Sequence, residues 1–584
     1  MLIKNTLKSF RIYWIAVIIP FIVLFFSFQF KLATGPYWQF PDPSYAYLLS
    51  SLSLIKNFST TYIDHPGTPV QILGAVVILL LNMGQSASGI IHRALLAPDF
   101  YLNAINLLMV VFVFITSSIL GVYTYRQTND KLAVLLSQLP LLGLLSLRSF
   151  SFYDYVLPVV TNVSPEPLLI SISILFNLYF LKLFFAKESQ EERLLTICLG
   201  FICGLGIATK LTFCPFLLLG LIICKRWMKL LFILVSIMSF TLWTIPIITS
   251  YVMIWGWIVR LLTHVGGYGS GAGGFVNIHQ YISNWQIILC RCGFLTIFAL
   301  IGVIFNLVQV ARNRSCSRSN VFFLAITFCI LVQSALIAKN YDEHYLVCVI
   351  SLFSPLFVLF YLNMNNKNFI FKSVIFIYVV VFTIQSLGHA LTYNKQLSGY
   401  TQGAVRFNNE IHAKFPKFIF IGVYPMPFSN FEAAFFEGND RDSSLQDEIA
   451  VLYPDYFSYF SNYVNSCAPY VSGIYSIKQK VLADDLILRG LHILFIAPKG
   501  YDFSNTPYTV LPVRQDGGGY AQAYLLVESN EKQANDYFEK SLKLSQEGEY
   551  QQAFAFAYKS RELHYQPVEK VDYLLGILYK QIQH

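Results

Sequence analysis

Two carboxylates, a tyrosine and a histidine stand in the polar stretch that follows the first apolar run. Asp42 and Tyr45 come first, and the pair Asp64 and His65 follows a short way further along. A carboxylate that lies near both lipid and water can accept a proton from a hydroxyl, which is general-base chemistry. The alternative for Asp42 is a helix N-cap, because Asp-Pro-Ser opens a helix well. The alternative for Asp64 and His65 is a stiff turn into an interfacial helix.

Charged residues also stand where later apolar runs begin or end. Glu166 lies between two prolines at the start of one run, and Lys210 separates two short runs. A lysine at the membrane rim suits an anionic group such as a lipid phosphate, although a snorkelling lysine would lie there too. Glu166 has the alternative of a first-turn acid that complements the helix dipole. Arg260 and His264, just before a glycine-rich tract, are further candidates for contacts with an anion.

Four polar residues crowd the start of a late apolar run: Asp342, Glu343, His344 and Tyr345. Two acids with a histidine could bind a divalent metal ion. A single short cluster lacks the separated ligands of a dependable metal site, so we assign no metal ligand. We keep His344 and Tyr345 as candidates for substrate binding.

The composition indicates that these residues belong to a membrane protein. Of 584 residues, 55% are hydrophobic and 12% are charged, whereas soluble domains have about 25% charged residues. The formal net charge of +9 comes from short connections between apolar runs, which is the positive-inside pattern and excludes a nucleic-acid face. The ten cysteines form no disulfide framework and are interpreted as small buried hydrophobes.

The apolar runs predict about eleven transmembrane helices. They are expected at 13–30, 102–125, 131–147, 167–185, 194–209, 211–224, 229–250, 284–308, 320–338, 345–363 and 371–390. The first run resembles a signal peptide, but no A-x-A-like cleavage site follows it, so we interpret it as a membrane helix.

The basic residues predict the orientation of these helices. With the N-terminus in the cytoplasm, the inside loops hold most of the lysines and arginines that lie between the spans, and the C-terminal domain lies outside the cytoplasm. Residues 69–83 are apolar enough to span, but counting them would place the basic loops outside. We therefore expect a helix in or dipping into the interface, within a first outer loop of residues 31–101.

We expect three domains. Residues 1–390 form the transmembrane domain, and 391–528 form an extracytoplasmic α/β domain with strands at 417–424, 491–497 and 520–527. The last segment, 529–584, has the spacing of small and aromatic residues of a tetratricopeptide (TPR) unit, or is a plain terminal helix pair. A single unit cannot bury its own face, so this segment is a candidate for binding a protein partner.

The order of these motifs resembles membrane glycosyltransferases of the GT-C class, in particular the branch of protein O-mannosyltransferases and lipid A aminoarabinose transferases. The resemblance covers about residues 10–390. It rests on the acid of the first outer loop (Asp42), the His65-Pro66 turn, the acid that opens a later span (Glu166), Ala208-Thr209-Lys210 and His344-Tyr345-Leu346. The chain departs from the branch at Pro43, Gly67 and His344, where glutamate, proline and arginine are common, which leaves the acceptor class open.

The resemblance implies a GT-C-like polytopic helical fold and an inverting hexosyl- or pentosyltransferase in a bacterial inner membrane. The donor would be a polyprenyl-phosphate sugar, and the acceptor an envelope glycan, lipid or protein on the outer face. Asp42 matches the proposed general base, and Lys210, with Arg260, would hold the phosphate. No cofactor is assigned, and a divalent metal remains an option.

Two other classes of function compete with this one. A transporter or flippase of a lipid-linked glycan predicts ionisable residues deep in the spans and inverted repeats, but most polar candidates stand at the outer rim. An interaction protein that acts through its exterior domain would need only one or two spans. The sequence therefore favours the transferase.

Overall fold

The computed structural model groups the described residues into two compact units. The first unit contains residues 1–34, 54–81 and 101–395, and the second contains residues 35–53, 82–100 and 396–584. The described residues are 2–60, 62–63, 66–145, 147–152, 155–266, 271–313, 317–363, 369–423, 429–440, 443–452, 457–460, 463–464, 469–470, 473–476, 479–498, 500–504, 506–515, 521–563 and 568–583.

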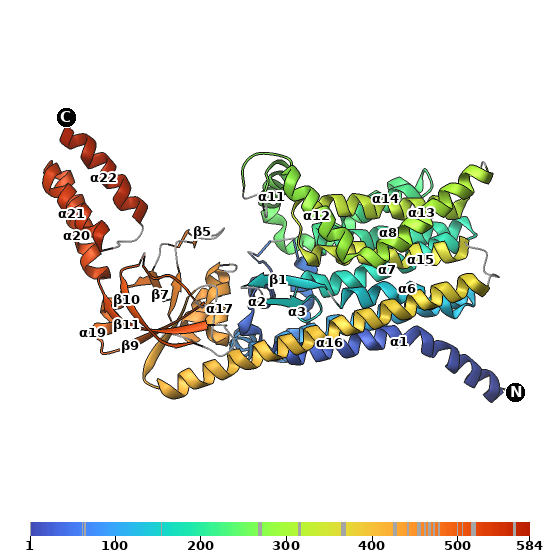
Figure 1. Cartoon of the computed structure of the whole chain (residues 1–584), viewed down its shortest axis with the longest axis horizontal. Helices are drawn as coiled ribbons and strands as arrows, with labels where there is room; N and C mark the ends of the chain where they lie inside the picture. The colour runs from blue at the N-terminus through green and yellow to red at the C-terminus, as the bar shows by residue number, and fades with distance from the viewer. Residues whose placement is uncertain are drawn as a thin grey trace. The chain divides into compact units, whose positions relative to one another are not determined.

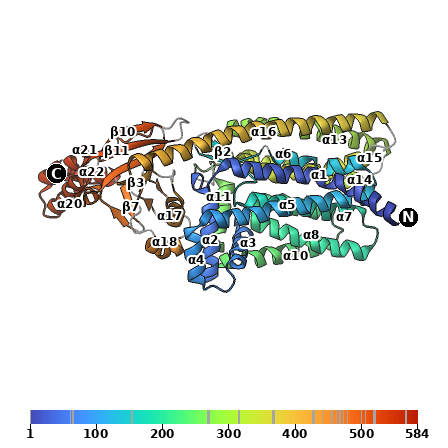
Figure 2. The same cartoon turned by 90° about the horizontal axis from the view of Figure 1, so that it is seen from below.

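The first unit is a bundle of helices that run side by side (Figures 1 and 2). Helices α5 and α16 continue in sequence into the second unit. The helices are α1 (Leu2–Thr34), α3 (Thr68–Leu81), α5 (Pro98–Thr128), α6 (Lys131–Leu144), α7 (Pro165–Phe185), α8 (Ser189–Thr209), α9 (Cys214–Ile223), α10 (Met228–Thr244), α11 (Tyr251–Thr263), α12 (Ile278–Arg291), α13 (Gly293–Asn313), α14 (Arg318–Lys339), α15 (Leu346–Asn363) and α16 (Phe369–Lys414). The short 3-10 helices η2 (Leu211–Phe213), η3 (Ile245–Ser250) and η5 (Glu343–Tyr345) and the hairpin β1 (Arg148–Phe152) with β2 (Tyr155–Pro158) connect them.

Helix α15 forms the centre of the bundle. Its side chains from Leu346 to Tyr361 are all buried, and it contacts α6, α7, α13 and α14. A helix that is apolar around its whole circumference is stable only when other helices cover it. The Asn177 side chain of α7 donates to the Ser351 carbonyl at 2.7 Å. This bond ties α7 to the central helix where no water would satisfy either group.

Helices α8 and α10 pack closely against each other and lie side by side in Figure 2. Gly204 permits their approach, because a Cβ atom there would lie 2.2 Å from the Ser236 carbonyl oxygen. The Ser239 hydroxyl then donates to the Phe201 carbonyl across the contact at 2.7 Å. Small residues and short polar bonds of this kind hold membrane helices together.

Within the described residues, eight helices are long and apolar enough to cross a membrane, or nine if α12 and α13 are one span. The predicted span 284–308 is bent by 90° between these two helices. The predicted spans 131–147 and 211–224 appear as the shorter helices α6 and α9, and α6 covers only about 21 Å. The segment expected in the interface is α3, of 14 residues, which packs on α8 and α10. The count of eleven spans therefore remains a prediction.

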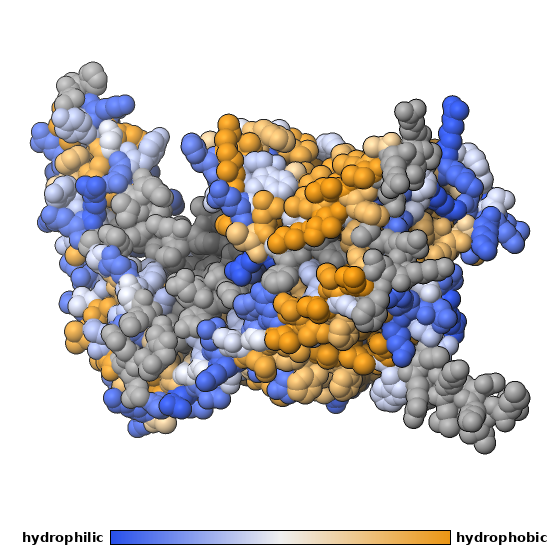
Figure 3. Space-filling view, turned by 45° about the vertical axis from the view of Figure 1, so that its right-hand side comes forward, coloured by the Kyte–Doolittle hydropathy of each residue, from blue (hydrophilic) through white to orange (hydrophobic). Residues whose placement is uncertain are grey.

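The surface of the helical unit is apolar in the way that a lipid-facing bundle requires. Figure 3 shows hydrophobic residues gathered over the helices, with hydrophilic residues towards the ends. Large exposed side chains include Leu230, Leu234, Ile237 and Met238 on α10, and Leu300, Ile301 and Ile304 on α13. An apolar surface of this extent needs a membrane or a partner to cover it.

One end of the helical bundle carries several charged residues that pair with each other. At the end where α7 stops and α8 and α14 start, Arg318 lies beside Glu192. At the same end, Asp130 accepts hydrogen bonds from Lys372 at 2.8 Å and from Tyr361 at 2.7 Å. The basic connections predicted to face the cytoplasm belong to this end, which we call the basic end.

The second unit contains a mixed sheet. In the described residues its strand order is β10-β11-β9-β3-β4-β7-β8, with β9, β3 and β4 parallel and the other neighbours antiparallel. The three predicted strands coincide with β3, β9 and β11. The strands are β3 (Phe418–Val423), β4 (Ser458–Phe460), β7 (Gly473–Ser476), β8 (Gln479–Val481), β9 (His492–Pro498), β10 (Tyr508–Gln515) and β11 (Ala521–Ser529), with a separate pair β5 (Tyr463–Val464) and β6 (Pro469–Tyr470).

Parts of the first outer loop belong to this second unit. The loop contributes η1 (Tyr37–Gln39), α4 (Ala87–Leu96) and most of α2 (Ser44–Asn57). These elements pack on α17 (Asn430–Asp440) and α18 (Gln446–Leu452), which follows the short η6 (Ser443–Leu445). The unit is thus assembled from three separate stretches of chain, and not only from residues after 390.

The terminal segment contains three helices where the sequence predicts a pair. After α19 (Ala483–Leu488) and the last strand come α20 (Glu531–Gln546), α21 (Tyr550–Glu562) and α22 (Val568–Gln583). The three share one small core that includes Phe538, Ala553, Ala557, Val571, Leu574 and Leu578. The third helix supplies three of these six residues. Two helices alone would leave an apolar face uncovered, and α22 covers that face.

Candidate functional site

The candidate site lies in the first unit, at the end of the bundle opposite the basic end. Glu166 stands in the first turn of α7, where Pro165 fixes the start of the helix. Lys210 follows the last residue of α8, and His344 lies in η5 at the start of α15. Three helix termini that are far apart in sequence thus bring their polar residues together.

Lys210 lies between the end of α8 and the start of η2. Gly206 leaves space for the tight packing at this junction. Its amide still donates to the Gly206 carbonyl at 2.9 Å, but its own backbone is extended and η2 begins after it. Phe213 folds back against α8, so a Cβ atom at Gly206 would lie 2.4 Å from the Phe213 ring. That ring is stacked on the Phe216 ring, with 4.0 Å between the two centroids. This packing restricts the position of Phe213.

The centre of the site is a buried ion pair. The Lys210 ammonium donates to Oε1 of Glu166, and their side chains are only 2% and 5% exposed. The ammonium also lies over the Tyr345 ring, 4.8 Å from its centroid, in a cation–π contact. Two buried charges are tolerated when each compensates the other, so the position of either side chain depends on its partner.

His344 extends this pair to a second carboxylate. Its Nδ1 lies 2.8 Å from Oδ1 of Asp342, and its Nε2 lies 3.8 Å from Oε1 of Glu166. The imidazole is buried and packs edge-on against Tyr345. Burial opposes the charged form of Asp342, but the contacts with His344 and the nearby Lys210 charge together outweigh it and lower the pKa of this carboxyl.

A cavity of about 370 Å³ adjoins the pair. Its polar wall includes Lys210, Lys339, Asp342 and Tyr345, and its apolar wall includes Trp257 of α11 and Leu336 of α14. An amphipathic cavity with two lysines fits a ligand that joins an anionic group to an apolar chain.

Lys339 of α14, which lines this cavity, binds the end of α11. Its ammonium donates to the carbonyls of Leu261 and Leu262 at 2.5 and 3.0 Å, near the end of α11. It also lies 4.9 Å from the centroid of the Phe275 ring. Of α11 itself only Ile254 is buried, so this lysine is a principal contact between the end of α11 and the bundle.

The structure brings together four of the predicted site residues: Glu166, Lys210, His344 and Tyr345. Arg260 is exposed on α11, and the Nδ1 atom of His264 lies 2.9 Å from the Thr263 hydroxyl. Neither is among the described residues that line the cavity. Their role in binding remains a prediction.

Four further predicted site residues belong either to the second unit or to the undescribed part of the chain. Asp42, half-buried before α2, and Tyr45 belong to the second unit. Tyr45 is fully buried and its hydroxyl donates to Oδ1 of Asn430 at 2.9 Å. Asp64 and His65 lie outside the described residues.

Sequence reasoning did not assign Asp342 and Lys339 to the substrate site. Asp342 appeared only as a potential metal ligand, and Lys339 was not a candidate site residue. Glu343, the third member of that potential metal group, pairs instead with Arg291 at 2.6 Å. In the part of the chain that the structure describes, no group of three or more His, Cys, Asp and Glu side chains is placed to hold a metal ion.

Comparisons with known proteins find a distant structural similarity. No family model matches the chain, and no curated protein matches its sequence. Among solved structures, the chain is similar to ArnT from Cupriavidus metallidurans in a crystal structure bound to undecaprenyl phosphate. The two chains are 11% identical, the match covers 87% of this chain and 97% of that one, and the TM-score is 0.48. A similarity at this level assigns neither activity nor substrate.

Proposed function

We propose that the chain is an inverting, GT-C-like glycosyltransferase. It moves a sugar from a polyprenyl-phosphate donor to a hydroxyl of an envelope acceptor on the outer face of a bacterial inner membrane. The observation that supports this proposal is the buried Lys210 in the wall of an amphipathic cavity, at the end of a membrane-type bundle opposite its basic end.

In this proposal the donor phosphate binds Lys210. The ammonium has three hydrogens and gives one to Glu166, which leaves donors for phosphate oxygens. Lys339 supplies a second positive charge in the same cavity, and Trp257 and Leu336 offer an apolar surface to the prenyl chain. Glu166 holds the ammonium in place before the donor arrives.

The reaction needs a base and a stabilised leaving group. Asp42, which matches the proposed general base of the family that the sequence resembles, accepts the proton of the acceptor hydroxyl. The hydroxyl oxygen attacks the anomeric carbon from the side opposite the phosphate, the bond from carbon to phosphate oxygen breaks, and polyprenyl phosphate leaves with both bonding electrons. Lys210 stabilises the charge that develops on that phosphate. In this proposal the second unit, which carries Asp42, also recruits the acceptor.

The proposal is tested by following the release of polyprenyl phosphate from a panel of polyprenyl-phosphate sugars. Purified protein in nanodiscs is given each donor with crude envelope as acceptor. We expect release that depends on the acceptor, and a product with inverted anomeric configuration. Binding without cleavage would contradict the transferase and favour the alternative, a transporter or flippase of a lipid-linked glycan.

A further inference from the structure

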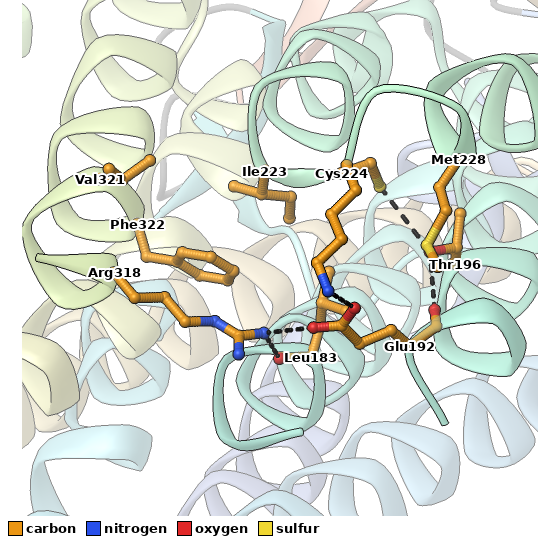
Figure 4. Close-up of a pocket in the computed structure, with 10 residues that line it drawn as sticks. Leu183, Glu192, Thr196, Ile223, Cys224, Met228, Arg318, Val321 and Phe322 are labelled. Carbon is orange, nitrogen blue, oxygen red and sulfur yellow. Dashed lines mark hydrogen bonds and ion pairs between the residues drawn. The ribbon is translucent and has the colours of Figure 1, made fainter. Parts of the chain in front are cut away.

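A second cavity lies at the basic end of the bundle, away from the candidate site. Its volume is about 260 Å³, and α7, α8, α9 and α14 contribute to its wall. Glu192, Lys225 and Arg318 form its charged part, and Ile223 and Phe322 are among its apolar residues. Figure 4 shows the Glu192 carboxylate facing Arg318, with Phe322 on the Arg318 side.

Glu192 organises the two cations of this cavity. Its side chain is only 4% exposed and pairs with the Lys225 ammonium and, at 3.2 Å, with Nη2 of Arg318. One buried carboxylate against two cations leaves the cavity with a formal excess of one positive charge. An excess of positive charge beside apolar walls attracts an anion that carries an apolar body.

Arg318 and Lys225 differ in how many contacts they make within the protein. Arg318 donates to the carbonyls of Leu183 at 2.6 Å and Ala186 at 2.9 Å, so it caps the end of α7 as well as binding Glu192. The Lys225 side chain is 59% exposed, and hydrogens of its ammonium other than the one given to Glu192 can bind a ligand. The polar contacts that join the end of α7 to α8 and α14 use Arg318 and Glu192 and do not use Lys225. Lys225 is therefore available for a ligand.

The surroundings of the cavity are those of a membrane interface. Trp227, which follows the lysine closely in sequence, is 59% exposed, and exposed tryptophans are typical of the headgroup level. Leu194 and Leu230 are both 62% exposed on the adjoining helices α8 and α10. A lipid whose phosphate enters the cavity would find an apolar helix surface for its chains.

We propose that this cavity binds the phosphate headgroup of an anionic phospholipid, with Lys225 and Arg318 as its cationic ligands and Glu192 as the residue that positions them. The site is separate from the proposed donor site, because α7 has the donor cavity at its start and this cavity at its end. It does not depend on the transferase assignment.

Native mass spectrometry of the detergent-held full chain tests this proposal. The protein is titrated with phosphatidylglycerol or phosphatidylcholine, and bound lipid is counted for the wild type, K225Q and the control R226Q. Arg226 is the exposed neighbouring cation that does not line the cavity. We expect preferential binding of phosphatidylglycerol and about fivefold weaker binding to K225Q, with R226Q like the wild type. The variant K225R keeps the charge and should retain binding, which separates lost affinity from lost folding.

Three results would overturn the proposal. Equal binding of the two lipids would remove the anionic preference, and equal losses in K225Q and R226Q would indicate a diffuse surface effect. Displacement of phosphatidylglycerol by an equal concentration of inorganic phosphate would show that the cavity takes a soluble anion and not a lipid.

Discussion

Lys210 and Glu166 are 44 residues apart in sequence, and their buried side chains form a direct ion pair. The pair joins the end of α8 to the start of α7 and faces a cavity whose walls are part apolar and part cationic. In the proposed function this pair has both a structural and a binding role. The first two predictions separate these roles.

Lys210→Met should destabilise the protein by about 3–5 kcal/mol, because Glu166 is left buried without its cation. The double variant Lys210→Met with Glu166→Gln removes both charges and should recover most of that stability. Thermal unfolding in detergent measures both. Equal destabilisation of the single and double variants would show that Glu166 does not depend on Lys210.

The same double variant should remain inactive in donor turnover, because the cation for the departing phosphate is absent in a folded protein. Release of polyprenyl phosphate, compared at matched folded fractions, measures this. The single variant Glu166→Gln serves as the control, since it keeps the lysine. Recovery of turnover in the double variant would exclude Lys210 as the phosphate ligand.

Acid should weaken the contact between Asp342 and His344. The pKa of Asp342 is lowered in the folded protein, so its contribution to stability is complete above the ordinary value of about 4 and is lost as the pH falls towards the lower folded value. Asp342→Asn should remove this part of the acid dependence of unfolding. A curve of melting temperature against pH tests it, and parallel curves for wild type and variant below pH about 4 would contradict it.

Gly206→Ala should disturb the site without removing any charged group. The new Cβ atom would lie 2.4 Å from the stacked Phe213 ring, so η2 and Lys210 have to shift. We expect a lower melting temperature and weaker donor binding. Gly388→Ala, on α16, is the matched control because nothing lies within 4 Å of its Cβ position. Equal behaviour of the two variants would show that the break after α8 tolerates a side chain.

Lys339→Met should loosen the end of α11, because the carbonyls of Leu261 and Leu262 lose their donor. Hydrogen exchange of α11 should become faster, and KM for the donor should rise. Arg260→Gln, a change on the exposed face of the same helix, is the control for hydrogen exchange only. Unchanged exchange in Lys339→Met would show that other contacts hold the helix.

The sequence predicted the parts of this molecule that depend on local pattern. Apolar runs located most membrane-length helices, and short strand-like runs coincided with β3, β9 and β11. It indicated that the runs at 131–147 and 211–224 are short, but it did not predict the bend between α12 and α13, because composition reports apolarity and not where a helix bends. The grouping of residues 35–53 and 82–100 with the C-terminal half follows from packing between distant segments, which periodicity does not encode.

The site was predictable to a similar extent. Glu166, Lys210, His344 and Tyr345 stood out because polar residues at the ends of apolar runs are costly without a role. Their pairing was not predictable, since it depends on which helix termini meet. For the same reason, the sequence could not show that Asp342 turns to His344 while Glu343 turns to Arg291.

The most direct test of the central claim is donor turnover by the wild type and Asp42→Asn, each measured together with donor binding. The account predicts that the wild type releases polyprenyl phosphate, and that the variant binds the donor equally but turns over at least about 10²-fold more slowly. Full activity of Asp42→Asn would contradict Asp42 as the base, and binding without any cleavage by the wild type would contradict the glycosyltransferase itself.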